Sequence, residues 1–315
     1  MKDLLESNKK IIINTDIDGV LSGLVLNNYL GCEIVGFSNS DNTVWIDESK
    51  VKTIYDAVYI DMFVPNKNVL CIDQHIIAVN ENHHRILKTN KNKINPNLDN
   101  PRFHLPNKSY YLKYPFGTIH YIIASLEEQG VKIDLNLYKQ VNSLKFSDLV
   151  LRADDAMKTT VDSSYIANAK AWWTWLQRKS GMASSISGMI QYLETLNSSK
   201  VEAIKKSTTQ LLTSPLTFGC TSPDGGYKQI IATDGKIQPK VIKYFNFISN
   251  SAGLDCFETN LKLTSCVGRV NRVMLNTQQQ INDLINNIQI NGQDVFSYAF
   301  VRSSTRPANL SYTIM

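Results

Sequence analysis

The stretch IIINTDIDG, residues 11–19, decides the fold of this chain of 315 residues. Its three consecutive isoleucines are β-branched, and such an uninterrupted run is typical of a strand that is buried on both faces. A polar turn follows, and residues 20–30 are then apolar enough for a helix that Gly31 ends. Residues 33–37 return to a strand-like pattern, which completes a strand–helix–strand unit.

Two further strand-like runs end on an aspartate, as the first one does. Residues 57–60 are followed directly by Asp61, and residues 69–72 by Asp73. In an open α/β sheet, ligands bind outside the carboxyl ends of the strands, so these acids are expected to meet at one edge. The sequence therefore predicts an α/β fold with a parallel sheet in its first part.

The rest of the chain predicts a long loop, then helices, then a second set of strands. Residues 80–115 are rich in Asn, Pro and Lys and lack periodicity, which indicates a surface excursion, and residues 184–212 indicate a helix. Four later runs look strand-like: KQIIAT, VIKYFNFI, FSYAFVRS and NLSYTI. We predict a parallel-sheet domain in residues 1–205 and a smaller mixed α/β domain in residues 206–315.

Composition excludes several classes of protein. Hydrophobic residues make up 43% of the chain, which is enough for packed cores, and 33 basic against 28 acidic residues leave a net charge of only +5. A polybasic nucleic-acid coat is therefore excluded. Five cysteines without a CxxC motif predict reduced thiols rather than zinc or disulfide sites. A charged N-terminus and the lack of a long apolar run predict a cytoplasmic protein without a membrane partner, for which an oligomer is possible.

The acids at the strand ends predict a metal site. Asp16 and Asp18, on the loop that leaves the first strand, can both bind a hard divalent ion, although a turn without function is the alternative reading. Asp61 and His75 follow later strands and add oxygen and nitrogen donors, a mixture that suits manganese and, with a poorer fit, magnesium. Asp155 continues an apolar helix face and needs a partner there, unless it is solvated at the helix end; Asp148 competes for this position.

The motifs in this order resemble those of the DHH phosphoesterase superfamily, over residues 10–160. IIINTDIDGVLSG resembles the first motif and AVYIDMF the second, VLCIDQHI stands where the DHH triplet falls, and LRADDAMK is similar to the fourth motif. The resemblance implies a DHH-type catalytic domain that binds two Mn²⁺ ions, with Mg²⁺ as a possible substitute. The implied metal ligands are Asp16, Asp18, Asp61, Gln74, and Asp155 or Asp154.

The same resemblance implies the remaining roles. His75 matches the histidine that faces the substrate phosphate, which makes it catalytic together with Asp61 and Asp18, and Ser22 ends the first motif as a substrate-binding residue. Two positions depart from the family: Asn14 replaces a histidine, and Gln74 replaces the first histidine of the triplet. Glutamine offers a weaker donor for manganese than imidazole does.

The second domain is expected to bind substrate. The run AFVRSSTRPANLSYTI is similar to the RS-containing strand of the nucleic-acid-processing branch, which implies contacts from Arg302 and Ser303, but the chain has no GGGH loop. Arg269 and Arg272 are interpreted as plain surface residues.

These observations predict a manganese-dependent phosphoesterase. It would hydrolyse a phosphodiester in a short oligonucleotide or cyclic (di)nucleotide by means of a metal-activated water. One alternative is a haloacid dehalogenase-like phosphatase with Asp16 as the nucleophile, since TDIDGVL also resembles that family's first motif. Another is a nucleotide-binding module whose metal sites have eroded, which Asn14 and Gln74 would fit.

Overall fold

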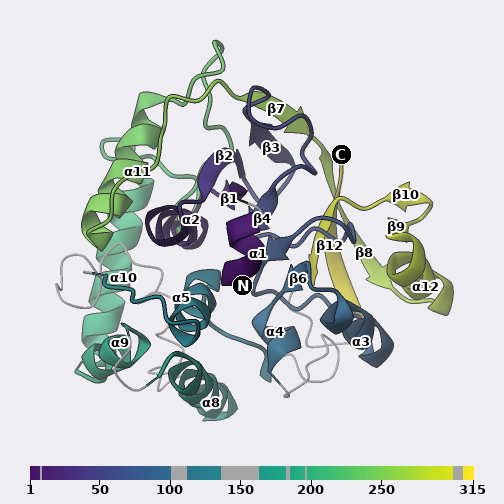
Figure 1. The fold of residues 1–315 in the computed structure, drawn as a ribbon, viewed down its shortest axis with the longest axis horizontal. Coiled ribbons are helices and arrows are strands. Elements are labelled where there is room, and N and C mark those ends of the chain that lie inside the picture. The colour runs from purple at the N-terminus through teal and green to yellow at the C-terminus, as the bar shows by residue number, and fades with distance from the viewer. Residues whose placement is uncertain (8, 101–111, 136–162, 182–184, 196, 301–307) are drawn as a thin grey trace.

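A computed structural model describes residues 1–7, 9–100, 112–135, 163–181, 185–195, 197–300 and 308–315. The architecture is mixed α/β, with one large sheet, a smaller three-stranded sheet and a two-stranded ribbon. Helices cover one face of the large sheet, and the small sheet packs toward the other face (Figure 1). No helix among these described residues is both long and apolar enough to cross a membrane.

The large sheet has seven strands and is mostly parallel. Its order is β6-β5-β4-β1-β2-β3-β7. The parallel strands are β1 (Lys10–Asn14), β2 (Glu33–Ser38), β4 (Val58–Ile60), β5 (Cys71–Ile72) and β6 (Lys93–Ile94). The strands β3 (Thr43–Ile46) and β7 (Thr264–Val267) extend it antiparallel. The isoleucines of β1 are fully buried in the middle of the sheet, so the predicted strand with two buried faces is confirmed.

The chain turns in opposite directions from β1, and this creates a switch point. After β1 it passes through α2 (Ile17–Leu30) to β2 on one side, and β4 later pairs with β1 on the other side. Helix α2 ends at Gly31, whose φ of 66° lies in the left-handed region, as the sequence predicts. Ligands bind preferentially at such a switch point, outside the carboxyl ends of the strands.

The helical side is built around α2. Helices α5 (Thr118–Glu128) and α11 (Pro239–Ala252) pack against α2, and α8 (Ser163–Ser180) packs against α5. The remaining helices on this side are α1 (Lys2–Ser7), α9 (Ser185–Glu194) and α10 (Ser198–Thr213). The tryptophans of α8 are packed in this core, where the ring centroids of Trp172 and Tyr114 lie 5.1 Å apart.

The opposite side carries the small sheet, which has the order β11-β12-β8. Its strands are β8 (Arg269–Leu275), β11 (Ser297–Phe300) and β12 (Ala308–Ile314). Beside it lie α12 (Gln278–Asn287), β9 (Gln289–Ile290), β10 (Gln293–Asp294), α3 (Glu81–Thr89) and α4 (Pro96–Asp99). Ring contacts of Tyr59 with Phe296 and of Phe63 with Tyr298 fasten the small sheet to the large one.

Several predicted elements are wrong. The run VIKYFNFI belongs to helix α11 instead of a strand, because its buried positions Val241, Tyr244, Phe245 and Ile248 follow helical spacing. KQIIAT forms no strand and contributes only an isolated bridge between Ile231 and Ile237. The helix expected over 184–212 is divided into α9 and α10.

The surface excursion expected at residues 80–115 is also wrong where it is described. This part of the chain contains α3, β6 and α4, and β6 joins the large sheet as its edge strand. These helices lack an apolar period, but asparagine caps define where they begin. The side chains of Asn80 and Asn95 cap α3 and α4 by accepting hydrogen bonds from backbone N–H groups.

The predicted division at residues 205 and 206 falls inside α10. Both α11 and β7 come after it, yet α11 packs on α2 and β7 pairs with β3 of the large sheet. The small sheet starts at Arg269, directly after Gly268.

Candidate functional site

Three carboxylates meet where β1 and β4 end. Asp16 and Asp18 follow β1, and Asp61 follows the neighbouring parallel strand β4. The side-chain nitrogen of Asn14 joins two of them, because it donates to Asp16 Oδ2 at 2.9 Å and to Asp61 Oδ2 at 3.1 Å. The structure therefore brings together the aspartates that the sequence places at successive strand ends.

Helix α5 adds the second set of contacts. The backbone N–H groups of Thr118 and Ile119 donate to the two oxygens of Asp18, at 2.7 and 2.8 Å. These groups belong to the first turn of the helix, where unpaired N–H groups and the helix dipole favour an anion. The hydroxyl of Thr118 donates to Asp61 Oδ1 at 2.7 Å, so one helix terminus holds both carboxylates.

Asp61 is in an unusual backbone and electrostatic state. Its φ of 62° lies in the left-handed region, which few residues other than glycine adopt. Burial raises its pKa well above the ordinary range, the charges of Asp18, Asp16 and Asp73 raise it further, and the hydrogen bond from Thr118 lowers it. Strain and buried like charge at one residue are typical of a binding or catalytic site.

Asp73 orients His75. Asp73 is buried, and its two oxygens accept from the backbone N–H of His75 at 3.0 Å and pair with its Nδ1 at 2.8 Å. The side-chain nitrogen of Gln74 lies 3.3 Å from His75 Nε2. An amide nitrogen only donates, so Nε2 accepts this hydrogen bond and Nδ1 carries the proton that is shared with Asp73.

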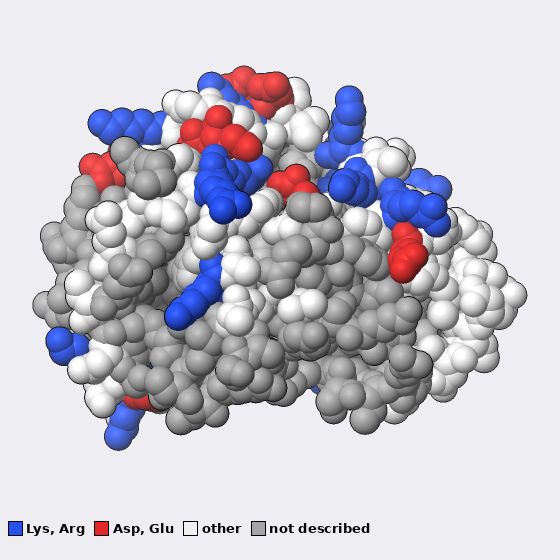
Figure 2. Space-filling model, turned by 90° about the horizontal axis from the view of Figure 1, so that it is seen from below, with Lys and Arg blue, Asp and Glu red and all other residues white. Residues whose placement is uncertain are grey.

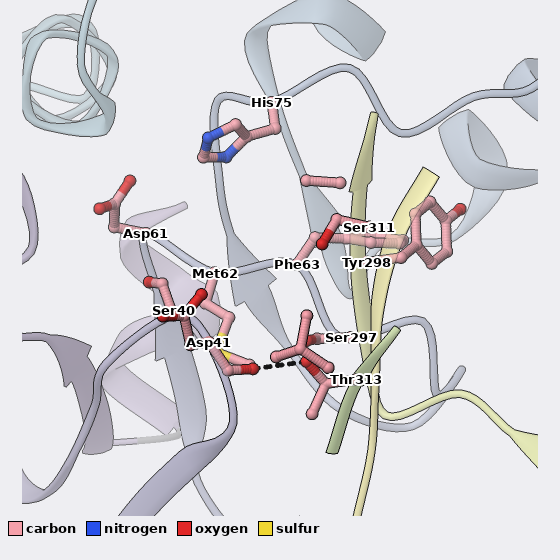
Figure 3. Close-up of a pocket in the computed structure, with 12 residues that line it drawn as sticks. Ser40, Asp41, Asp61, Met62, Phe63, His75, Ser297, Tyr298, Ser311 and Thr313 are labelled. Carbon is pink, nitrogen blue, oxygen red and sulfur yellow. Dashed lines mark hydrogen bonds between the residues drawn. The ribbon is translucent and has the colours of Figure 1, made fainter. Parts of the chain in front are cut away.

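His75 and Asp61 border a pocket between the two sheets. In Figure 3 the imidazole of His75 points toward the side on which Asp61 lies. The opposite side is formed by the strands of the small sheet, with the hydroxyl-bearing residues Ser297, Ser311 and Thr313. No lysine or arginine is among the described residues that line this pocket.

The remaining predicted residues are distributed as follows. Gln74 is buried, and its amide faces His75. Ser22 is fully buried in α2 and is not among the described residues that line the pocket. Arg269 and Arg272 are exposed on β8, in agreement with their interpretation as surface residues. Asp148, Asp154, Asp155, Arg302 and Ser303 lie outside the described residues.

Thr118 is a site residue that the sequence analysis missed. A threonine at the start of a helix carries a local signal for capping, and Gly117 precedes it. Nothing in the local sequence connects it to Asp18, which lies 100 positions earlier in the chain. Ser297, Ser311 and Thr313 were missed for the same reason, because small polar residues in a strand are ordinary on a solvated face.

The donor set at the strand ends suits a hard cation. Within the described ranges, no group of three or more His, Cys, Asp or Glu residues has the arrangement of a complete metal site. Asp61 nevertheless accepts one hydrogen bond at each oxygen, and a carboxylate oxygen has a second lone pair for a cation. Carboxylate oxygens are the ligands that magnesium and manganese prefer, and a cation would offset the charge that raises the pKa of Asp61.

Figure 2 shows one face of the molecule, on which the lysines and arginines of the described residues are interspersed with acidic residues.

Comparison with known proteins found no family model that matches the chain, no similar curated protein and no similar solved structure.

Proposed function

We propose that this protein is a manganese-dependent phosphoesterase of the DHH type, which hydrolyses phosphodiesters of short oligonucleotides or cyclic (di)nucleotides. The observation that carries the proposal is Asp61, a strained and buried carboxylate at the switch point of the sheet. It lies beside Asp16 and Asp18, whose charges raise its pKa. Structural stability alone does not require such a cluster of like charges, whereas binding of a divalent cation does.

The proposed metal ligands are Asp16, Asp18 and Asp61, with Asp155 or Asp154 from outside the described residues. When bound, Mn²⁺ or Mg²⁺ supplies an activated water and neutralises charge on the phosphoryl oxygens. Thr118 and Asn14 position these carboxylates, because each donates a hydrogen bond to Asp61. Gln74, the remaining ligand that the resemblance implies, is the weakest candidate, since its amide nitrogen faces His75.

His75 is proposed to act on the phosphoryl group. Its imidazole borders the pocket beside Asp61, and Asp73 fixes its orientation through two hydrogen bonds. His75 would contact a phosphoryl oxygen in this pocket, with its ring held in place by the buried Asp73. Asp73 is thus a positioning residue that acts through His75.

A manganese-supplemented screen tests this function. The purified protein is incubated with short oligoribonucleotides, cyclic dinucleotides and pyrophosphate, and the products are separated by chromatography. We expect hydrolysis of a phosphodiester that needs Mn²⁺ and is lost in Asp61→Asn. If calorimetry detects bound Mn²⁺ but no phosphodiester is hydrolysed, the phosphoesterase proposal is wrong and a nucleotide-binding module replaces it.

Trapping of a covalent intermediate distinguishes the two enzyme classes. A metal-activated water would attack phosphorus directly and leave no phosphorylated residue. A haloacid dehalogenase-like enzyme would form a phospho-aspartate at Asp16, an acyl phosphate that borohydride reduces after rapid quenching. Mass spectrometry of the peptide that contains Asp16 therefore decides between the two mechanisms.

A further inference from the structure

A second hollow borders Asp16 of the carboxylate cluster. It is bordered by residues 14–16 at the end of β1 and by the glycine-containing loop of residues 221–228. This loop is fastened to the site: the N–H of Ile17 donates to Asp224 O at 3.0 Å, and the N–H of Tyr227 donates to Thr15 Oγ1 at 3.3 Å. The loop that borders the hollow is therefore hydrogen-bonded to the turn that carries Asp16.

The loop needs its glycines to approach the site. Gly225 and Gly226 have φ values of 90° and 84°, which side chains other than hydrogen rarely tolerate. A Cβ atom on Gly226 would lie 3.3 Å from the backbone nitrogen of Asp16 and from Thr15 Oγ1. The backbone of the loop is thus placed against the turn that carries Asp16.

The two hollows adjoin one turn and one pair of carboxylates. Ser40 and Asp41, in the turn between β2 and β3, line both of them. The pocket beside the small sheet is bordered by Asp61, and the second hollow by Asp16. Since Asn14 donates to both carboxylates, the two acids are adjacent. A phosphate bound through a cation on these acids would therefore border both hollows.

The lining of the second hollow is suited to hydroxyl groups. Asp41 and Asp224 offer carboxylate oxygens, which accept hydrogen bonds and repel anions, and Asn39 and Ser222 add neutral polar groups. A carboxylate that accepts from a ribose hydroxyl is a recurring mode of nucleoside recognition. Lys228 is the basic residue of the lining, against the three acids Asp16, Asp41 and Asp224, so a second phosphate is disfavoured there.

We propose that the hollow between Asp16 and residues 221–228 is a second subsite, which binds the pentose of a nucleoside. This inference rests on the proposed function and specifies its substrate: a phosphodiester with a nucleoside arm on both sides of the scissile phosphate. One arm occupies the pocket beside Ser311, and the other occupies the hollow beside Asp224. Pyrophosphate and polyphosphate, which lack such arms, are poor ligands.

Binding of two non-hydrolysable probes tests the second subsite without turnover. The probes are a dinucleoside phosphorothioate, which has two arms, and the methyl ester of a nucleoside phosphorothioate, which has one arm. Calorimetry with Mn²⁺ present measures both affinities in the full chain. We expect the two-armed probe to bind at least about 10-fold more tightly, because the second arm adds hydrogen bonds.

Two variants locate the arms. Asp224→Asn changes the hollow and Ser311→Ala changes the pocket, and we expect each to weaken the two-armed probe by about 5- to 10-fold. A one-armed probe fills a single hollow, so at most one of the two variants weakens it. Asp234→Asn is the matched control: this exposed aspartate lies in a turn of the same segment, accepts from the N–H of Lys236 and leaves both affinities unchanged.

Three results would overturn the second subsite. They are equal affinity for the two probes, unchanged binding of the two-armed probe to Asp224→Asn, and no binding of the two-armed probe at all. Failure of the phosphoesterase proposal would give a different result, namely no hydrolysis in the manganese screen. The two failures are distinguishable because the probes are not hydrolysed.

Discussion

The two walls of the pocket differ in charge. The wall on the large sheet concentrates charge: Asp18, Asp61 and Asp73 are buried carboxylates at the ends of parallel strands. The wall on the small sheet is neutral where it meets the pocket, with the hydroxyls of Ser297, Ser311 and Thr313. Buried charge is costly without a partner, whereas hydroxyls bind water or ligand at little cost.

This difference indicates that the two walls have different roles in binding. Hydrogen bonds from Thr118 and Asn14 hold Asp61 in place, while burial and the neighbouring carboxylates raise its pKa. In the proposed function, the charged wall receives a cation and the neutral wall recognises an uncharged part of a ligand. Substitutions on the charged wall are expected to have the larger effects.

The largest effect is expected for Asp61→Asn. Asparagine tolerates a positive φ and removes the charge, so the variant should fold, while manganese-dependent turnover falls by about 1,000-fold. In a chelator its thermal midpoint should equal or exceed that of the wild type, because repulsion by Asp16 and Asp18 is removed. Calorimetric scans with and without Mn²⁺ measure both changes.

Asp47→Asn is the control for this substitution. Asp47 is also buried at a strand end, where it accepts from Ser49, and it lies outside the carboxylate cluster. This variant should retain the stabilisation by Mn²⁺. A wild-type-sized manganese shift in Asp61→Asn would contradict the role of this wall.

Lys93→Met tests a buried charge of the opposite kind, one that is fully paired. The Lys93 ammonium donates to the backbone oxygens of Val64, Asn66 and Val69 at 2.6 to 2.7 Å. These bonds close the loop that follows Asp61. Burial lowers the pKa of Lys93. Loss of three charge-assisted bonds should lower the free energy of unfolding by about 3 kcal/mol.

Urea unfolding of Lys93→Met and of the exposed control Lys91→Met measures this difference. The control should stay within about 0.5 kcal/mol of the wild type. Equal stability of the two variants would mean that the buried ammonium does not hold the loop.

His83 provides a pH test on a titratable group outside the pocket. Burial lowers its pKa from 6.5 to about 4, and its Nδ1 accepts the N–H of Val79. Since the unfolded chain binds a proton between pH 6.5 and 4 and the folded chain does not, this contribution is complete above pH 6.5 and is lost as the pH falls toward 4. The loss amounts to about 3 kcal/mol at most.

Comparison of His83→Gln with the wild type isolates this contribution. Stability is measured by urea unfolding at several pH values, and the difference between the two proteins should shrink as the pH falls from 6.5 to 4. A difference that does not depend on pH would show that His83 titrates normally in the folded protein.

The smallest effect is expected on the neutral wall. The hydroxyl of Thr313 donates to the backbone oxygen of Asp41, which ties the small sheet to the turn shared by both hollows. Thr313→Val keeps the shape and removes the bond, so the free energy of unfolding should fall by about 1 kcal/mol. Thr264→Val, at an exposed position of β7, should change it by less. If both variants lose the same free energy of unfolding, the Thr313 hydrogen bond contributes no more to stability than an exposed surface contact.

Local patterns predicted most of the first half of the sheet. Buried isoleucines, a terminating Gly31 and aspartates directly after apolar runs are signals that act within a few residues. The same reasoning failed for α11, where β-branched and aromatic residues indicated a strand although the buried positions have helical spacing. It also failed for residues 80–100, where asparagine caps define short elements without apolar periodicity.

The sequence by itself determined that Asp16, Asp18 and Asp61 follow strands and are candidates for a metal site, because the carboxyl ends of parallel strands share an edge. Only the tertiary structure decided what surrounds them. It placed Thr118 of α5 on two carboxylates, Ser311 across the pocket and the loop of Asp224 against Asp16. Those partners come from segments far apart in the chain, and such contacts depend on how whole elements pack, which no local pattern records.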